Sequence, residues 1–132
     1  MTKQKLTLAF LLSTLLLSTP SYADWTYIGT NAAGDKLHLD ADRLRKHNGL
    51  IYFWDLEDFI KPTDGGLSAM TYRRGDCNTM GYNYLSISVY EQPMGKGKTV
   101  TSSNYNDEDW IYAKPGSIGE FVMRNACDFS SK

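Results

Sequence analysis

The histidines and cysteines are the residues of this sequence best suited to metal or thiol chemistry. The chain has two of each: His38, His47, Cys77 and Cys127. A zinc site needs about four converging ligands, and neither histidine has a partner at ligand spacing. We therefore expect His38 on the polar face of a strand and His47 in a loop. The cysteines lack the Cys-x-x-Cys spacing of redox or metal-binding thiols, so no metal and no other cofactor is predicted.

Carboxylates cluster in three segments where acid–base chemistry is conceivable. The segments are Asp40 with Asp42, Asp55 with Glu57 and Asp58, and Asp107 with Glu108 and Asp109. Acid–base catalysis needs a cleft that shifts the pKa of one carboxyl group, and the first pair lacks the glycine and glutamate of a calcium loop. We interpret all three as solvated turns and caps. The segment 94–98 lacks the spacing of a phosphate-binding loop, so we expect a flexible hairpin there and predict no catalytic residue.

The N-terminal segment has the pattern of a secretory signal peptide. Lys3 and Lys5 precede an apolar run over residues 6–17, and small residues stand at positions 21 and 23. We predict a signal peptide over residues 1–23 and cleavage before Asp24. The alternative, a transmembrane anchor, is disfavoured because the run is shorter than the roughly 20 residues that span a bilayer. No cysteine stands at the cleavage site to carry the lipid of a lipoprotein.

The predicted mature chain, residues 24–132, is a single small domain. Removing 23 of the 132 residues leaves 109, which is typical of one domain. The full chain has a formal net charge of −1, and the loss of Lys3 and Lys5 changes it to −3. Nucleic-acid binding requires a basic face that neutralises phosphates, and the sequence has no long basic stretch. We therefore predict that this protein does not bind nucleic acid.

Export also determines how the cysteines are interpreted. Two cysteines in an oxidising compartment indicate one disulfide, so we predict a bond between Cys77 and Cys127. Closing a loop of this length restricts the unfolded chain by about 4 kcal/mol in the chain-entropy description.

Alternating apolar residues and turn residues predict a small antiparallel sheet. Strand patterns occur at residues 25–29, 36–40, 50–59, 67–74, 84–90 and 99–101, separated by turns rich in Gly, Asn, Asp and Pro. Residues 40–45 are expected to form one helical turn capped by an aspartate, and residues 102–109 a loop. The strand over residues 84–90 has the clearest period of two, and we expect it at the centre of the sheet.

A short amphipathic helix is predicted after Ser117. Ser117 and Glu120 form a capping-box pattern, and apolar residues follow at helical spacing. These apolar residues are Ile118, Phe121, Val122 and Ala126. The helix should pack on the sheet, and the predicted disulfide would join its end to the start of the central strand. The predicted fold class is α+β, a small antiparallel β-sheet with a packed C-terminal helix and one disulfide.

The aromatic residues indicate both a core and a contact surface. Four large rings are expected in the core: Phe53, Trp54, Trp110 and Phe121. In the central strand, Leu85, Ile87 and Val89 are predicted to face the core, which places the tyrosines on the opposite face. Tyrosine beside arginine is typical of contact surfaces. The predicted partner-binding residues are therefore Tyr82, Tyr84, Tyr90, Arg73 and Arg74. The alternative is a second layer of structure that covers this face.

Several positions together resemble the surface-adhesin protein E family of small exported Gram-negative proteins. They are Trp25 with Ile28-Gly29, Leu39-Asp40, Leu44-Arg45, Trp54, Asp76-Cys77, Trp110, Pro115-Gly116-Ser117 and Cys127, and they extend across the predicted mature chain. The resemblance implies an antiparallel sheet with a packed C-terminal helix and the same disulfide. It also implies a non-enzymatic role, with adhesion to host matrix or serum proteins as the activity.

Three functional hypotheses follow. The first is an exported binding protein of the adhesin E type, in the periplasm or at the outer-membrane surface, whose partner is a host extracellular-matrix protein or an envelope protein. The second is a periplasmic accessory module that binds another envelope protein. The third is a small hydrolase, which needs a polar pocket with a perturbed carboxylate or histidine.

The signal-peptide hypothesis predicts that the exported protein begins at Asp24 and partitions as a soluble protein. N-terminal sequencing and mass measurement of the protein recovered from the cell envelope check this prediction. Recovery of a chain that retains Met1 in the membrane fraction would instead make the apolar segment an anchor.

Overall fold

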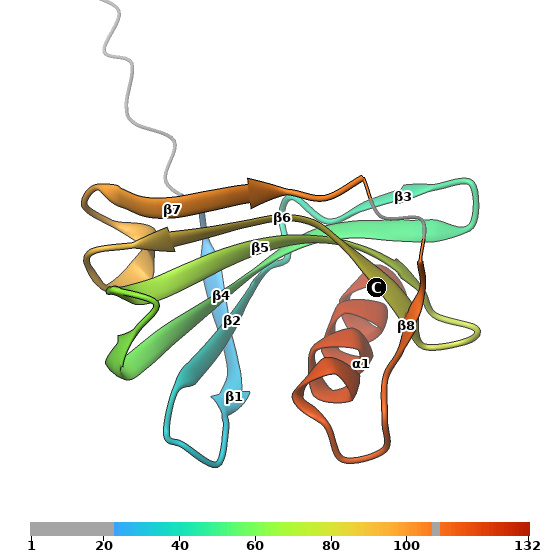
Figure 1. The fold of residues 1–132 in the computed structure, drawn as a ribbon. Coiled ribbons are helices and arrows are strands. Elements are labelled where there is room, and N and C mark those ends of the chain that lie inside the picture. Colours follow the sequence, from blue (N-terminus) through green and yellow to red (C-terminus); the bar gives the residue numbers. More distant parts are fainter. Residues whose placement is uncertain (1–22, 107–108) are drawn as a thin grey trace, which may run out of the picture.

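A computed structural model describes residues 23–106 and 109–132, so almost all of the predicted signal peptide lies outside the described residues. The described residues form eight strands, one 3₁₀ turn and one α-helix (Figure 1). The elements are β1 (Trp25–Thr30), β2 (Lys36–Asp40), β3 (Arg45–His47), β4 (Leu50–Thr63), β5 (Gly66–Asp76), β6 (Gly81–Tyr90), η1 (Pro93–Gly95), β7 (Thr99–Asn104), β8 (Ile111–Tyr112) and α1 (Ile118–Ser130).

The strands form one antiparallel sheet with α1 packed on one side. The strand order is β1-β2-β4-β5-β6-β7, while β3 pairs with β4 and β8 pairs with β6. Figure 1 shows a strongly curved sheet with α1 against its concave side. We call this side the helix face and the opposite side the outer face. This architecture, with the disulfide described below, confirms the predicted fold class.

Two hairpins are closed by the turn chemistry that the sequence displays. Asn48 and Gly49 connect β3 to β4, and Asp64 and Gly65 connect β4 to β5. All four residues have positive φ, between 50° and 82°, as a two-residue type I′ turn requires. These turns fix the register of β4, the longest strand, with both of its hairpin partners.

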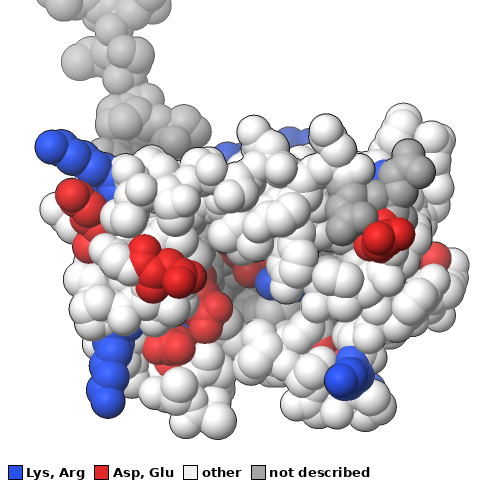
Figure 2. All heavy atoms as spheres, viewed as in Figure 1, with Lys and Arg blue, Asp and Glu red and all other residues white. Residues whose placement is uncertain are grey.

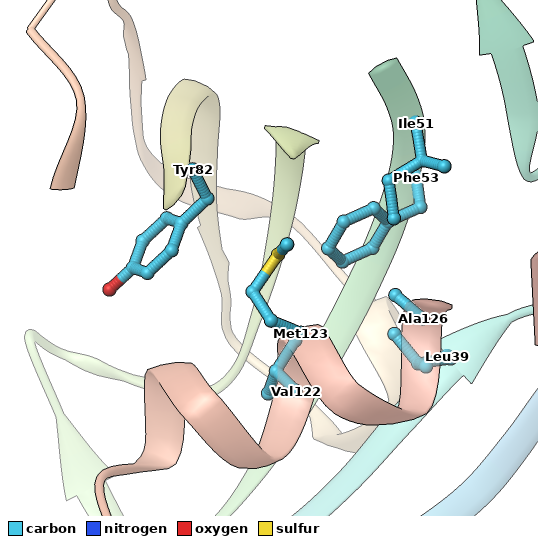
Figure 3. Close-up of a cluster of buried hydrophobic side chains, with 7 residues drawn as sticks. All are labelled: Leu39, Ile51, Phe53, Tyr82, Val122, Met123 and Ala126. Carbon is cyan, nitrogen blue, oxygen red and sulfur yellow. The ribbon is translucent and has the colours of Figure 1, made fainter. Parts of the chain in front are cut away.

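The hydrophobic core lies between α1 and the helix face (Figure 3). Its buried members are Leu39, Ile51, Phe53, Tyr82, Val122, Met123 and Ala126. Gly75 of β5 leaves room for the helix: a Cβ there would lie 2.7 Å from Cε of Met123, and the end of the methionine side chain would have to shift. Phe53 is completely buried, as expected. Trp54 and Trp110 are only half-buried, and Phe121 is 36% exposed, so their assignment to the core was wrong.

The helix begins as its capping pattern predicts. The side chain of Ser117 accepts a hydrogen bond from the Glu120 amide at 3.2 Å. The buried residues of α1 are Val122, Met123 and Ala126, whereas Ile118 is 41% exposed. The predicted apolar stripe is therefore confirmed for Val122 and Ala126 and wrong for Ile118 and Phe121, and Met123 is an additional buried residue. No helix of the described residues is long and apolar enough to cross a membrane.

Two connecting segments differ from expectation. Asp40 caps a tight turn, in which its carboxylate accepts a hydrogen bond from the Arg43 amide at 3.2 Å, but no helical turn forms. The chain instead continues into β3, because the Asn48-Gly49 turn pairs residues 45–47 with the start of β4. β7 extends to Asn104, into the segment expected to be a loop.

The disulfide joins the turn after β5 to the last turns of α1. Cys77 and Cys127 are bonded, with their Cα atoms 5.8 Å apart, and this confirms the predicted pairing. The bond spans 50 residues of sequence, and it therefore fixes the helix that covers the core to the sheet.

Replacing both cysteines together, Cys77→Ala with Cys127→Ala, should lower the free energy of unfolding by about 4 kcal/mol, because the unfolded chain regains the entropy of an open loop. Urea denaturation of the oxidised protein and of the double variant measures the difference. Reduction of the wild-type protein should produce a similar loss, and a change below about 1 kcal/mol would contradict this role for the bond.

Candidate functional site

A β-bulge in β6, which lies next to the edge strand β7 and not at the centre of the sheet as expected, determines which tyrosines are exposed. Between β5 and β6, Tyr72 pairs with Ser86 but its neighbour Arg73 pairs with Tyr84. Leu85 is therefore an extra residue in β6, and an extra residue reverses the alternation of side chains along a strand. The Leu85 carbonyl, which does not pair with β5 at the bulge, accepts a hydrogen bond from the Tyr105 amide at 2.9 Å.

The bulge places three of the five predicted partner-binding residues on the helix face. Directly paired residues of antiparallel strands point to the same face, so Tyr84 and Arg73 lie on the face of their neighbour Phe53. Tyr82 is a buried core residue at 7% exposure, and Arg73 is buried to the same degree. The prediction that Tyr82 and Tyr84 lie opposite Ile87 and Val89 is therefore wrong, because its period of two was carried across the bulge.

Arg73, Asp55 and the two tyrosines form a buried polar cluster under the sheet's curve. The Arg73 guanidinium donates hydrogen bonds to both carboxylate oxygens of Asp55, at 2.6 and 3.3 Å. Its central carbon lies 5.1 and 4.9 Å from the ring centroids of Tyr82 and Tyr84. The cation is thus neutralised by one carboxylate and shielded by two aromatic rings.

The pKa shifts of this cluster follow from its burial. Desolvation raises the pKa of Asp55, and the charge and hydrogen bonds of Arg73 oppose the rise. Burial acts to lower the pKa of Arg73, but the attraction of Asp55 outweighs it and the pKa of the guanidinium is raised. Burial also raises the pKa of Tyr82. Both oxygens of Asp55 are occupied, so this carboxylate is built into the fold rather than presented to a substrate.

Beside α1 the helix face is hollowed, and acidic side chains gather on the left half of the view in Figure 2. Glu57 accepts a hydrogen bond from the Asn31 side chain at 3.0 Å. Its pKa is raised first by burial and then by the negative charges of Asp35 and Asp55. The interpretation of the middle acidic segment as a solvated turn is wrong for Asp55, which is 5% exposed within β4.

The outer face carries a row of half-buried aromatic rings, which we call the aromatic row: Tyr52, Trp54 and Tyr72. The rings of Trp54 and Tyr72 are stacked, with centroids 4.7 Å apart and an interplanar angle of 22°. The Tyr52 ring is 6.4 Å from the Tyr72 ring. At the other end, the Arg43 guanidinium lies 5.7 Å from the Trp54 ring centroid and pairs with the buried carboxylate of Asp40.

Arginines border the aromatic row on both sides. Arg45 of β3 and Arg74 of β5 are both direct cross-strand neighbours of Tyr52. Arg74 is fixed, because it donates to the buried Asn83 side-chain oxygen at 3.0 and 2.7 Å and lies 5.1 Å from the Trp110 ring centroid. Of the predicted partner-binding residues, Arg74 and Tyr90 share this outer face with the row.

The loop between β6 and β7 folds back onto the outer face. The Met94 amide donates to the Asp58 carboxylate at 2.6 Å, and the Gly95 amide donates to the Ser68 hydroxyl at 2.9 Å. The Ser68 hydroxyl in turn donates to the Gln92 carbonyl at 2.6 Å. The segment expected to be a flexible hairpin is therefore attached to β4 and β5 by side-chain hydrogen bonds.

The outer face presents side chains that are typical of contact surfaces. Rigid rings of Tyr and Trp together with Arg are the side chains that contribute most to protein interfaces, and the outer face presents them in adjacent positions. Within residues 23–106 and 109–132, no group of three or more His, Cys, Asp or Glu side chains is arranged to hold a metal ion.

The aromatic row has a signal in the sequence that was assigned to the wrong face. Tyr52 and Trp54 alternate with Ile51 and Phe53, so a strict period of two places one pair in the core and the other outside. The size of the Trp54 ring favoured the core, although its position in the alternation favoured the outer face. Alternation was the better guide in this strand, which pairs with β5 without a bulge over residues 51–58.

Comparisons with known proteins agree with this architecture. The family model described as surface-adhesin protein E matches residues 25–128. Crystal form II of Haemophilus influenzae protein E has a TM-score of 0.57 at 13% identity, over 80% of this chain and 90% of that chain. Another structure of Haemophilus influenzae protein E has a TM-score of 0.56 at 11% identity, over 82% and 87% of the two chains. At such low identity the likeness shows the fold alone. No curated protein matches the chain.

The buried ion pair predicts a large loss of stability when one partner is removed. Asp55→Asn should lower the free energy of unfolding by about 3–5 kcal/mol, because Arg73 is left as a buried charge without a counter-ion. The matched control is Glu120→Gln, which removes an ion pair to the 69% exposed Arg124 and should cost at most about 1 kcal/mol. Urea denaturation measures both. Equal losses in the two variants would show that the Asp55 charge is dispensable.

Proposed function

Because this chain belongs to the surface-adhesin protein E family, we propose that it is an exported, non-enzymatic binding protein that holds a protein partner on the outer face of its sheet. The partner class that the family name supports is a host matrix or serum protein. The proposed cellular location is the envelope or the cell surface, reached through cleavage of the predicted signal peptide over residues 1–23.

The observation that carries the proposal is the position of the aromatic row. The other face of the sheet is covered at one end by α1 and carries the polar cluster, in which both carboxylate oxygens of Asp55 accept hydrogen bonds from Arg73. The rings of Tyr52, Trp54 and Tyr72 are half-buried and lie side by side on the outer face. A contiguous aromatic area of this kind on a soluble domain is typical of an interaction site.

The geometry also indicates what the partner should present. Trp54 and Tyr72 already stack on each other, so their exposed edges are ordered before binding and lose little conformational entropy on association. Arg45 and Arg74, on either side of Tyr52, favour acidic groups around an apolar centre. The proposed partner surface is therefore an apolar patch bordered by carboxylates.

A periplasmic accessory module is the alternative, and it would use the same face for an envelope protein. Cell location separates the two functions. Protease treatment of intact cells should digest an adhesin at the surface and leave an accessory module in the periplasm intact. Complete protection of the folded, exported protein would therefore reject the adhesin function while leaving the contact face in place.

Substitutions in the aromatic row should reduce partner capture more than stability. Tyr52→Ala and Tyr72→Ala, made separately, should each weaken binding to the captured matrix or serum protein at least tenfold, since buried aromatic contacts contribute more than about 1.4 kcal/mol at interface centres. Surface plasmon resonance against a panel of purified matrix and serum glycoproteins measures the affinities. Thermal unfolding measures the accompanying change in Tm.

Two tyrosines outside the row serve as controls. Tyr112→Ala removes an exposed ring on β8, at 63% exposure, and should change neither affinity nor Tm. Tyr84→Ala removes a ring that covers Arg73 on the helix face, and should lower Tm while leaving the affinity of the folded fraction unchanged. Loss of binding in Tyr84→Ala but not in Tyr72→Ala would place the contact surface on the helix face.

A further inference from the structure

A pocket of about 720 Å³ opens on the outer face next to the aromatic row. The lining residues that matter here are Trp25, Arg43, Met70, Met94 and Lys96. Ala23 also borders the pocket, but it is the last residue of the predicted signal peptide, whose cleavage would remove it from the exported protein. Its volume lies within the roughly 300–1,000 Å³ that small-molecule sites occupy. The residues come from the start of β1, the turn after β2, the middle of β5 and the loop that contains η1. The pocket is thus separate from the aromatic row. The two are adjacent at Arg43, which lines the pocket and lies over the Trp54 ring.

The apolar part of the pocket is formed by one indole and two thioethers. Trp25 supplies a rigid wall, and the methionines Met70 and Met94 supply flexible ones. Methionine side chains adapt to the shape of an apolar ligand, and proteins use them where a binding surface must repack. This wall therefore suits a flexible apolar chain better than a rigid ring system.

The polar part of the pocket is cationic. Its two charged lining residues are Arg43 and Lys96, and none of the lining residues is acidic. Arg43 is partly neutralised by Asp40, but within the described part of the chain Lys96 is not engaged in an ion pair. The pocket therefore carries positive charge without a matching acidic group, and an anionic ligand would supply the missing negative charge.

The loop wall is fixed in place before any ligand binds. Asp58 and Ser68 accept hydrogen bonds from the consecutive amides of Met94 and Gly95, at 2.6 and 2.9 Å. Met94 is held at φ 60° and ψ 29°, a left-handed conformation that costs energy for a residue other than glycine. A glycine would fit this backbone without the cost, so the side chain of Met94 can be removed without straining the loop.

We propose that this pocket binds an amphiphilic anion, a linear apolar chain that ends in a carboxylate. The chain lies against Trp25, Met70 and Met94, and the carboxylate faces Arg43 and Lys96. The proposal does not depend on the protein-binding function, because the ligand is a small molecule and Lys96, Met94 and Met70 are not part of the aromatic row.

Dodecanoate tests the ligand class below its micelle concentration, with dodecanol and dodecylammonium as probes of the same chain length. We expect saturable binding of dodecanoate to the exported protein with a Kd below about 1 mM, and at least tenfold weaker binding of the other two. Methyl NMR of the methionines locates the site, because Met70 and Met94 should shift while the core residue Met123 should not. Equal affinity for all three probes, no saturable binding, or binding only to vesicles would overturn the proposal.

Substitutions separate a ligand-binding role from a structural one. Met94→Gly removes the apolar wall where the backbone favours glycine, so Tm should stay within about 3 °C of the wild type while the Kd for dodecanoate rises at least fivefold. Lys96→Gln should weaken dodecanoate at least threefold and leave dodecanol unchanged. The matched control is Lys98→Gln, an exposed lysine that does not line the pocket. Unchanged affinity in both Met94→Gly and Lys96→Gln would reject the site.

Discussion

The guanidinium of Arg73 lies inside the sheet's curve, and its burial constrains everything around it. A buried cation needs a counter-charge and shielding from the apolar surroundings. Asp55 supplies the charge from β4 and the tyrosines of β6 supply the shielding. Three adjacent strands must therefore keep one register for the cluster to exist. The same register brings Phe53 and Gly75 under α1, where the glycine allows Met123 to approach.

The bulge at Leu85 is what makes this arrangement compatible with one strand. Without it, Tyr82 and Tyr84 would both lie on the face opposite Ile87, and Arg73 would lack both of its aromatic covers. With it, aromatic and aliphatic residues of β6 share the helix face in two successive zones, the tyrosines near α1 and the aliphatic residues beyond it. The physical consequence is that the cation of Arg73 is covered by the side chains of its own sheet.

Local patterns in the sequence predicted the sheet, the helix start and the disulfide, because each depends on short-range chemistry. The capping box of Ser117 and the Asn-Gly and Asp-Gly turns act over a few residues. The disulfide follows from the number of cysteines in an exported chain. The faces of β6 could not be predicted in this way. Neither strand carries a residue type that marks the bulge, which is set by how Arg73 and Tyr84 pack together. The burial of Asp55 was missed for the same reason, since its partner is 18 residues away in sequence. The outer-face position of Trp54 could have been predicted, because Trp54 alternates regularly with Ile51 and Phe53. The prediction gave more weight to the size of the side chain than to its position in the alternation.

The different chemistry of the two faces explains why we propose recognition on the outer one. On the helix face, Arg73 and Asp55 are paired and two rings cover the cation, so a partner that displaced these rings would expose a buried ion pair, at a cost of several kcal/mol. On the outer face, the rings of Trp54 and Tyr72 keep their positions by stacking on each other and need no additional cover to remain ordered. Their remaining surface is hydrated, and a partner that replaces this water gains free energy without disturbing the core. A surface can be altered by substitution without loss of the fold only where it is energetically separate from the core. In this domain, the row formed by Tyr52, Trp54 and Tyr72 meets that condition, and the cluster around Arg73 does not.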